Sequence, residues 1–286
     1  MTNWGRWGTE DQVGMINLIT REAVLENAKL VRRGQIYNLS VPLGSDTPTH
    51  PIRQAPQHYV KFVPDAQGGV GYGEDVLVMS THSGTHVDAL SHFWVGGEMF
   101  NRQPADQVNA FGAGSNSIDS VPPIWTRGIL LDVAGNRGVD RLEAGEVITP
   151  EELERCCERQ QVTCRPGDAV LVRTGWYRTY AEDRARWAAG KPGLGGAAIN
   201  WLIERDVAVL GVDTTAAEPD PPDPADGPAG MAIAHLTFLH QHGGYLIETL
   251  DLEELGRDKV HEFLFVAAPL RIAGGLGSPL TPIAVA

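Results

Sequence analysis

The sequence predicts a mixed α/β or α+β domain. Three observations support this prediction: short apolar runs rich in β-branched residues recur along the chain, segments with helical spacing lie between some of them, and Gly, Pro or Asp bounds most of the runs. The runs are spaced too irregularly for a barrel of eight equal βα units. With 286 residues, 42% of them hydrophobic, the chain can bury one full-sized core. We therefore expect a single domain over residues 1–286.

The first helix is expected between Thr20, a suitable N-cap, and Gly34, a suitable terminator, because the apolar residues between them recur at helical spacing. A second helix is predicted after Thr149, since Pro150 suits the first helical position. Further helices are expected at 197–204 and within 231–240. Strands are expected in chain order at 36–40, 76–79, 128–133, 169–172, 207–211, 245–247 and 263–267.

One segment, 218–228, is strongly biased in composition. It contains five prolines and several acidic residues, which argue against regular structure and for solvation. We predict a surface loop over 218–228. It is either a plain connector or a lid over a site in the histidine-bearing segment that follows.

Charge and cysteine usage exclude several classes of function. The formal net charge is −13 and no basic stripe is present, so nucleic acid is not an expected partner. The chain begins without a basic and apolar leader and has no apolar run long enough to span a membrane. Cys156, Cys157 and Cys164 form no C-x-x-C pair that would bind zinc or cycle a disulfide. These features predict a cytoplasmic protein that does not act at a membrane.

Histidines cluster between residues 82 and 92. His82, His86 and His92 lie within eleven residues that also contain Asp88, although the whole chain has only 9 histidines. Imidazole nitrogen and carboxylate oxygen together are the ligands that zinc, manganese or iron accepts. A hydrogen-bond network without metal is the alternative interpretation.

The spacing of the cluster predicts a bend. Residues 82, 86 and 88 would share one face of a strand, but four residues of straight strand separate side chains by about 13 Å, whereas ligands of one ion must converge on it at about 2 Å. A single helix would point Asp88 away from both histidines. Gly84 lies where a bend is needed. We therefore predict a strand at 76–80 that runs into a tight turn around a metal ion.

A second candidate group lies in the segment 235–248. Glu248 ends an apolar run, and a buried carboxylate is costly unless a cation receives it. Glu248 and His235 are therefore candidates to complete the ligand set or to hold a second ion. His240 and His242 are expected at the surface or in packing. The isolated residues His50, His58 and His261 are assigned no role.

The string from His82 to His92, HSGTHVDALSH, resembles the H-x-G-T-H-x-D-x-x-x-H motif of the cyclase family of metal-dependent hydrolases, which includes bacterial kynurenine formamidase and isatin hydrolase. The resemblance covers nearly the whole chain. It includes the segments 5–8, 127–133, 167–176, 211–214 and 268–279.

This resemblance implies a set of roles. His82, His86 and Asp88 would bind the principal metal, zinc or manganese, and His92 would be the catalytic acid/base. His235 and Glu248 match later residues of the metal centre, so one or two ions per chain are expected, and Glu248 is also assigned to catalysis.

The resemblance also implies the fold and the assembly. The expected fold is a single swivelling domain with a small sheet beside a barrel-like mixed sheet, and the expected assembly is a homodimer or homotetramer. Ala89 and Leu90 stand where true formamidases often have a proline-containing step, and together with the loop at 218–228 they resemble a longer subgroup. N-formylkynurenine is therefore not the favoured substrate.

The predicted function is hydrolysis of a C–N bond in a small cyclic amide, aryl amide or formamide by metal-activated water. A lactone or ester hydrolase on the same centre is one alternative, and a non-catalytic ligand-binding protein with a structural ion is another. Four aromatic residues are candidates for pocket walls, with core packing an equal alternative: Phe93, Trp94, Trp176 and Tyr177.

Overall fold

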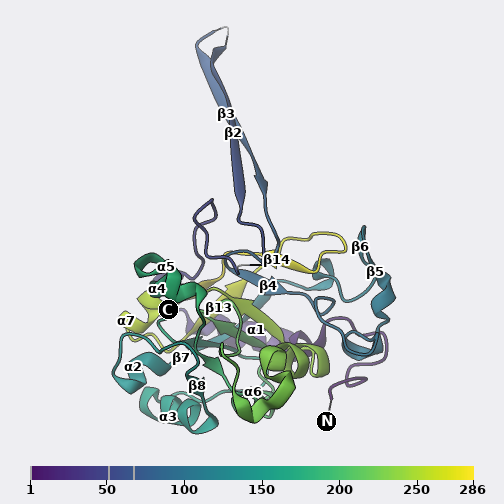
Figure 1. Cartoon of the computed structure of the whole chain (residues 1–286), viewed down its shortest axis with the longest axis vertical. Helices are drawn as coiled ribbons and strands as arrows, with labels where there is room; N and C mark the ends of the chain where they lie inside the picture. The colour runs from purple at the N-terminus through teal and green to yellow at the C-terminus, as the bar shows by residue number, and fades with distance from the viewer. Residues whose placement is uncertain (1, 51, 67) are drawn as a thin grey trace.

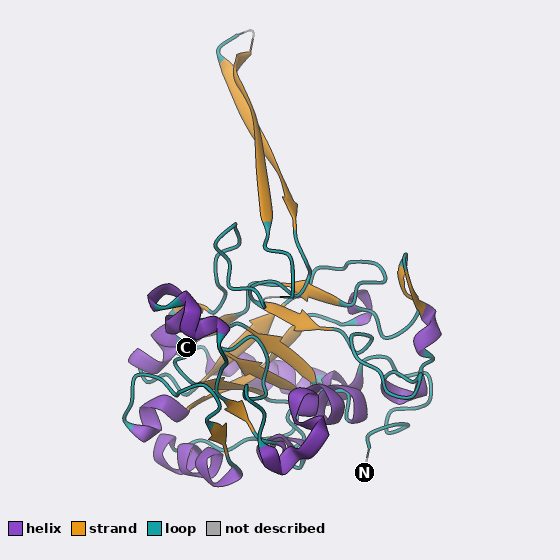
Figure 2. Ribbon diagram, in the orientation of Figure 1, coloured by secondary structure: helices purple, strands orange, loops and turns teal. Residues whose placement is uncertain are grey.

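A curled nine-stranded sheet forms the centre of the molecule, with helices and small two-stranded sheets around it (Figures 1 and 2). The computed structural model describes residues 2–50, 52–66 and 68–286. In spatial order the strands are β1 (Ile36–Asn38), β15 (Ile283–Val285), β13 (Glu262–Ala267), β7 (Ile124–Asp132), β9 (Ala169–Arg173), β11 (Val209–Val212), β12 (Tyr245–Glu248), β4 (His86–Asp88) and β14 (Gly277–Pro279). The predicted mixed fold is confirmed.

Four parallel strands, β7, β9, β11 and β12, make up the middle of this sheet. Antiparallel strands extend it on both sides, with β13 next to β7 and β4 next to β12. Parallel strands covered on both faces are apolar along their whole length. This explains why the sequence marks β9 and β12 so clearly, as every residue in both strands is buried. The carboxyl ends of the four strands meet at one edge, where ligands of such sheets usually bind.

The α-helices are short and lie around the sheet: α1 (Arg21–Asn27), α2 (Val133–Arg137), α3 (Pro150–Gln160), α4 (Tyr177–Glu182), α5 (Arg184–Ala188), α6 (Gly196–Ile203) and α7 (Glu253–Arg257). The 3-10 helices are η1 (Gly14–Leu18), η2 (Ala28–Leu30), η3 (Phe100–Arg102), η4 (Ala105–Gln107), η5 (Ile118–Ser120) and η6 (Pro224–Ala232), and η7 (His235–Gln241) is a π-helix. The helix predicted after Thr149 is confirmed. The Thr149 N–H donates to Glu152 Oε2 at 3.2 Å, as in a capping box.

The first helix begins where it was predicted but ends early. The Thr20 hydroxyl accepts a hydrogen bond from the Ala23 N–H, so α1 starts at Arg21. It ends at Asn27 and continues only as η2, because the chain must turn to pair β1 with β15. The predicted extension to Gly34 is wrong. Leu25, one of the apolar residues at helical spacing on which the prediction depended, is 72% exposed.

A long hairpin projects from the body (Figure 1). It consists of β2 (Gln57–Ala66) and β3 (Val70–Val78), paired so that Tyr59 faces Val76. The strand predicted at 76–79 is only the end of β3, and all of β3 is exposed. Two further small sheets were not predicted: β8 (Val147–Ile148) with β10 (Gly193–Leu194), and β5 (Val108–Asn109) with β6 (Gly112–Ala113).

The prediction for 218–228 needs two corrections. Glu218 is only 1% exposed, because it follows β11 into the interior before the chain reaches the surface at Asp220. Pro224–Ala232 forms η6, since proline fits the first positions of a helix and Gly227 supplies the kink that separates its two turns. In the part of the chain that the structure describes, no helix is both long and apolar enough to cross a bilayer.

Candidate metal centre

The histidine-bearing segment turns sharply before it joins the sheet. β3 ends at Val78, a turn follows, and β4 begins at His86. Gly84 has φ +63°, and a Cβ at this position would lie 2.8 Å from Thr47 Cγ2. Only glycine combines this conformation with this close approach. The predicted bend at Gly84 is confirmed.

Thr85 fixes the end of this turn. Its hydroxyl donates to the carbonyl of Thr249 at 2.6 Å and accepts from the Val41 N–H at 2.9 Å. Gly84 contributes as well, because its carbonyl oxygen lies 2.8 Å from His86 Nδ1. An imidazole that donates from Nδ1 leaves Nε2 as an acceptor facing the site.

Strand β4 places His86 and Asp88 on one face of the sheet. His86 lies opposite Glu248 of β12, and its Nε2 is 3.4 Å from Glu248 Oε2 and 3.6 Å from Asp88 Oδ1. His82, in the turn, brings Nδ1 to 3.2 Å from Asp88 Oδ1. The curl of the chain thus brings together side chains that a straight strand would separate.

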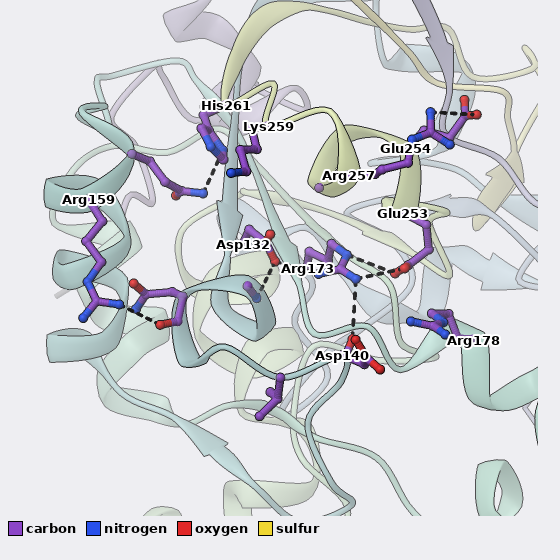
Figure 3. Close-up of a pocket in the computed structure, with 15 residues that line it drawn as sticks. Asp132, Asp140, Arg159, Arg173, Arg178, Glu253, Glu254, Arg257, Lys259 and His261 are labelled. Carbon is purple, nitrogen blue, oxygen red and sulfur yellow. Dashed lines mark hydrogen bonds and ion pairs between the residues drawn. The ribbon is translucent and has the colours of Figure 1, made fainter.

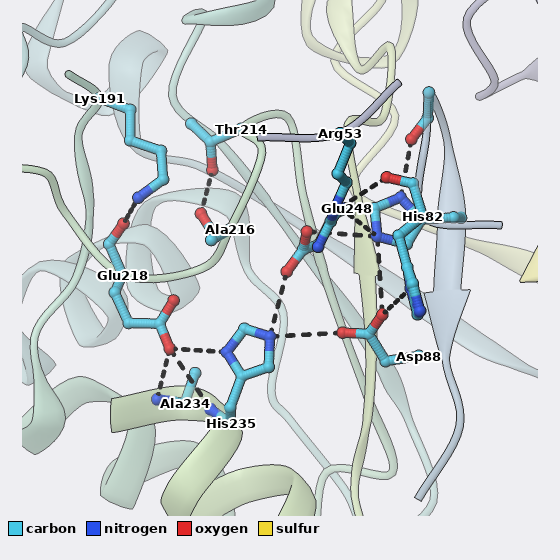
Figure 4. Close-up of polar contacts among 12 residues, drawn as sticks. Arg53, His82, Asp88, Lys191, Thr214, Ala216, Glu218, Ala234, His235 and Glu248 are labelled. Atoms are coloured by element: carbon cyan, nitrogen blue, oxygen red, sulfur yellow. Dashed lines mark hydrogen bonds and ion pairs between the residues drawn. The ribbon is translucent and has the colours of Figure 1, made fainter. Parts of the chain in front are cut away.

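His235 approaches the same carboxylate from the π-helix η7. Its Nε2 lies 3.4 Å from Asp88 Oδ2, and its Nδ1 lies 3.0 Å from Glu218 Oε1 (Figure 4). Glu218 was not predicted as a site residue because the prolines after it suggested a surface loop. One signal was available: Glu218 ends an uncharged stretch beyond a buried strand, where ligands of parallel sheets gather.

His92 lies next to His82, with ring centroids 4.1 Å apart. Phe93 contacts His235, with ring centroids 5.8 Å apart, so it borders the site as one of the predicted pocket walls. Trp94 is 45% exposed, whereas Trp176 is buried and stacks on Trp187.

The six predicted site residues are therefore brought together, although their individual roles stay predictions. Ligand atoms of His82, Asp88 and His92 lie within 4.8 Å of one another, and so do those of His86, Asp88 and Glu248. Asp88 belongs to both groups. This arrangement is compatible with either one or two ions.

Burial and charge set the protonation of the histidines. Burial lowers the pKa of His82 to about 3 and also lowers the pKa of His92, which keeps both rings neutral near pH 7. Burial opposes protonation of His235 too, but Glu218 and Asp88 outweigh it and raise its pKa. Glu248 and Asp88 do the same for His86. Neutral imidazoles are the form that binds metal, so a cation and protons compete for His86 and His235.

The residues present fit a divalent cation. Asp88 and Glu248 are each 1% exposed at the side chain. Among the described residues, Asp88 Oδ2 and Glu248 Oε1 accept no hydrogen bond and have only the longer contacts to His235 Nε2, at 3.4 and 3.7 Å. Buried carboxylate oxygens without partners are costly unless a cation receives them. One cationic group already approaches: Arg53 Nη1 lies 3.5 Å from His86 Nε2. Carboxylates with imidazoles suit zinc or manganese.

The larger cavities of the described residues lie outside this ligand set. A cavity of about 290 Å³ lies beyond Glu218 and is lined in part by His50 and Lys191, so His50, assigned no role from the sequence, is one of its wall residues. A larger one of about 690 Å³ lies at the ends of β7 and β9, where Arg173 binds Asp132 and Glu253 (Figure 3). None of the clustered histidines lines the larger cavity, and the histidine in its wall, His261, belongs to the isolated group. We therefore place the chemistry at the ligand set.

Three further histidines lie away from the ligand set. His240 is 3% exposed and packs against Trp4, with ring centroids 5.2 Å apart, which confirms the expectation of a packing residue. His261 lies 2.8 Å from Gln160 through Nδ1. His58 is on the hairpin, where its Nε2 lies 2.7 Å from Asp75 Oδ2.

Comparisons with known proteins identify a family and several relatives of this chain. The family described as "Putative cyclase" matches residues 37–219, more than half of the chain. Isatin hydrolase of Roseibium aggregatum is 22% identical over 258 residues, covering 83% of this chain and 88% of that protein. Cyclase-like protein 1 of Arabidopsis thaliana is 22% identical over 270 residues, covering 91% of each.

Solved structures agree with this result. A crystal structure described as a novel cyclase is 29% identical, with a TM-score of 0.91 over 100% of this chain and 98% of that one. Isatin hydrolase A from Ralstonia solanacearum is 25% identical, with a TM-score of 0.66 over 87% of this chain and 91% of that one.

Proposed function

This chain belongs to the cyclase family of metal-dependent hydrolases, and we propose that it hydrolyses the C–N bond of a small cyclic amide or aryl amide. The observation that carries the proposal is the buried Asp88 carboxylate shared by two groups of candidate ligands. Structural metal sites are usually closed by four protein ligands, whereas catalytic sites keep an open position. The similarity to isatin hydrolases supports a cyclic amide as the substrate class.

His82, His86 and Asp88 would hold the principal cation, zinc or manganese, and leave a position open for water or substrate. His235 and Glu248 would complete the centre or hold a second ion. When bound, such a cation polarises a carbonyl group and lowers the pKa of water toward neutrality, supplying electrophile and nucleophile together. Glu218 would orient His235: by accepting from Nδ1 it leaves Nε2 directed at Asp88.

His92 would transfer the proton. Its pKa is lowered by burial, so the ring is neutral near pH 7 and able to accept a proton from the attacking water. The leaving nitrogen then needs a proton, which the same ring can return. General acid–base assistance of this kind is typically worth about 10²–10⁴-fold in rate. Phe93, next in the chain and in contact with His235, would limit the access of bulk water.

The test combines metal analysis with a substrate panel. Purified protein and its His86→Ala variant are compared for zinc, manganese and iron per chain, and the wild type is assayed with lactams, aryl formamides and the matching lactones. We expect one or two equivalents of metal, reduced in the variant, and faster turnover of the amides than of the lactones. No metal after reconstitution, or turnover of lactones alone, would contradict the proposal.

We also propose that the protein acts as a homodimer or homotetramer. The β2–β3 hairpin supports this proposal, because a two-stranded hairpin without a covering layer is marginally stable in water, yet Phe62 and Tyr72 on it are 71% and 58% exposed. Light scattering of the wild type and of a Phe62→Ser, Tyr72→Ser variant tests it: a monomeric wild type would reject the proposal.

A cytoplasmic location is also proposed, and it agrees with the three free cysteines, since disulfides are rare in the cytosol.

A further inference from the structure

The cavity of about 290 Å³ is separated from the metal centre by Glu218. One wall consists of Pro219 and Asp220, which follow Glu218 in the chain, and another contains His50. The loop that carries His50 also carries Arg53, whose Nη1 donates to the His82 carbonyl at 2.5 Å. The same two short segments therefore border both the cavity and the ligand set, so a molecule in the cavity lies beside the reacting centre.

Lys191 places a positive charge in this cavity. Its ammonium is largely buried and donates to the carbonyl of Glu218 at 2.5 Å (Figure 4). Within the described residues no carboxylate lies within 4.0 Å of it, so Lys191 makes no ion pair. An ammonium has three donors, and a buried charge is costly unless it is paired. Burial accordingly lowers the pKa of Lys191.

One side of the cavity wall is apolar. Trp187 is 8% exposed and is held by stacking on Trp176, with an angle of 16° between the rings. Pro219, Pro222 and Met231 complete this side. A volume of about 290 Å³ is at the lower end for small-molecule sites, and therefore suits a body of about one ring.

The charges around the cavity leave Lys191 available to an anion. The carboxylates of Asp88, Glu218 and Glu248 carry three negative charges, but each faces a histidine at the metal centre, and a bound divalent ion would compensate two of them. Asp220 adds one negative charge in the cavity wall, and Lys191 and the nearby Arg53 offset what remains. In a chain with a net charge of −13, the surroundings would thus be close to neutral once an ion is bound, and Lys191 itself lines the cavity.

We propose that Lys191 is a specificity-determining residue, which binds a carboxylate carried by the substrate while the apolar part of the same molecule fills the cavity against Trp187. This inference rests on the proposed hydrolase function and narrows its substrates to anionic amides with a small apolar body. It adds a role for a residue outside the histidine motif.

Binding is tested with benzoate and its neutral isostere benzamide. Calorimetry with the metal-loaded wild type is expected to give at least 10-fold tighter binding of benzoate, since a hydrogen bond to a charged group contributes about 1.5–3 kcal/mol. Lys191→Met is expected to lose this preference, and Lys191→Arg to retain most of it. Metal content is measured for each protein, because a benzoate bound only to the ion would be unaffected by Lys191→Met.

Kinetics distinguish substrate binding from a structural role. For a pair of aryl amides with and without a carboxylate, Lys191→Met is expected to raise KM for the anionic member about 10- to 100-fold more than for the neutral one. A merely structural role would affect both members equally. Equal benzoate and benzamide affinities in the wild type, or an unchanged preference in Lys191→Met, would overturn the inference. Lysine-dependent benzoate binding without any amide turnover would reject the hydrolase function alone.

Discussion

Glu248 lies directly opposite His86 across the pairing of β12 with β4, with 3.4 Å between Glu248 Oε2 and His86 Nε2. Directly opposed residues of an antiparallel pair point to the same face of the sheet. The sheet register itself therefore sets the distance between these two candidate ligands, and no loop has to position Glu248.

Substitution of Glu248 tests this relationship. We expect Glu248→Gln to lower metal affinity at least 10-fold, because the amide keeps the shape but loses the charge that offsets the cation. Competition with a chromophoric chelator measures the affinity. Glu254→Gln, on the surface helix α7, is the matched control. Equal affinities in wild type and Glu248→Gln would exclude Glu248 from the ligand set.

Glu218→Gln tests the orientation of His235. Glu218 Oε1 accepts from His235 Nδ1 at 3.0 Å, and removal of such a partner typically costs about 10–100-fold in metal affinity or activity. We expect metal affinity to fall within this range in Glu218→Gln, while the circular dichroism spectrum stays close to that of the wild type. The surface variant Glu254→Gln serves as the control here as well. A Glu218→Gln protein with wild-type affinity would show that His235 needs no partner.

Gly84→Ala is expected to destabilise the turn. The alanine would be strained at φ +63° and its Cβ would lie 2.8 Å from Thr47 Cγ2, so we expect a loss of about 1–3 kcal/mol in the free energy of unfolding. Urea denaturation followed by fluorescence measures it. Gly44→Ala, where a Cβ would meet nothing within 4 Å, is the control and should change stability far less.

The stability of the protein should depend on the protonation of Asp213. Burial raises the pKa of Asp213 to about 6, although its carboxylate accepts hydrogen bonds from Thr174 and Gly175. Because this pKa is above the unfolded value, the native state binds the proton more tightly. The resulting stabilisation is complete below about pH 4 and is lost as the pH rises through 6.

The measurement is the difference in unfolding free energy between wild type and Asp213→Asn at pH 4 and pH 7. A shift of about two units corresponds to about 3 kcal/mol, so the wild type should lose about that much relative to the variant over this range. A difference that does not change with pH would mean that Asp213 titrates alike in the folded and unfolded chain.

The parts of the fold that could be predicted are those determined by local sequence. Thr20 and Thr149 mark helix starts because a cap bonds to residues two or three positions away. The strands β9 and β12 are marked by unbroken apolar runs, since both of their faces are buried. Helix caps and apolar runs can both be recognised without knowing which segments of the chain they will pack against.

The hairpin could not be predicted in the same way. Neither face of its strands packs against a core, so the sequence shows no alternation of apolar and polar residues by which the strands could be recognised. β3 also contains Gly71 and Gly73, which weaken the strand pattern. The end of the first helix was missed for a related reason, because pairing of β1 with β15, far along the chain, determines where it stops.

Only part of the site could be predicted from the sequence. Gly84 and the cluster around Asp88 lie in one segment, so their spacing could be tested against ligand geometry. His235 and Glu248 were candidates from the apolar run that ends at Glu248, but only the family resemblance connected them with the first cluster. Glu218 and Lys191 were missed, since Lys191 lies just before β10 and Glu218 follows β11, and only the fold brings these two segments together.

The strands that pair with β4 affect when the site can form during synthesis of the chain. β4 pairs with β12 on one side and β14 on the other, and both neighbours come from the last part of the chain. During synthesis the N-terminal part of a chain emerges first. The histidine segment therefore leaves the ribosome long before Glu248 or Gly277 exists to pair with it. The candidate ligand group that includes Glu248 can therefore assemble only after most of the chain has been made, so a metal ion held by that group would be bound late in synthesis or after it.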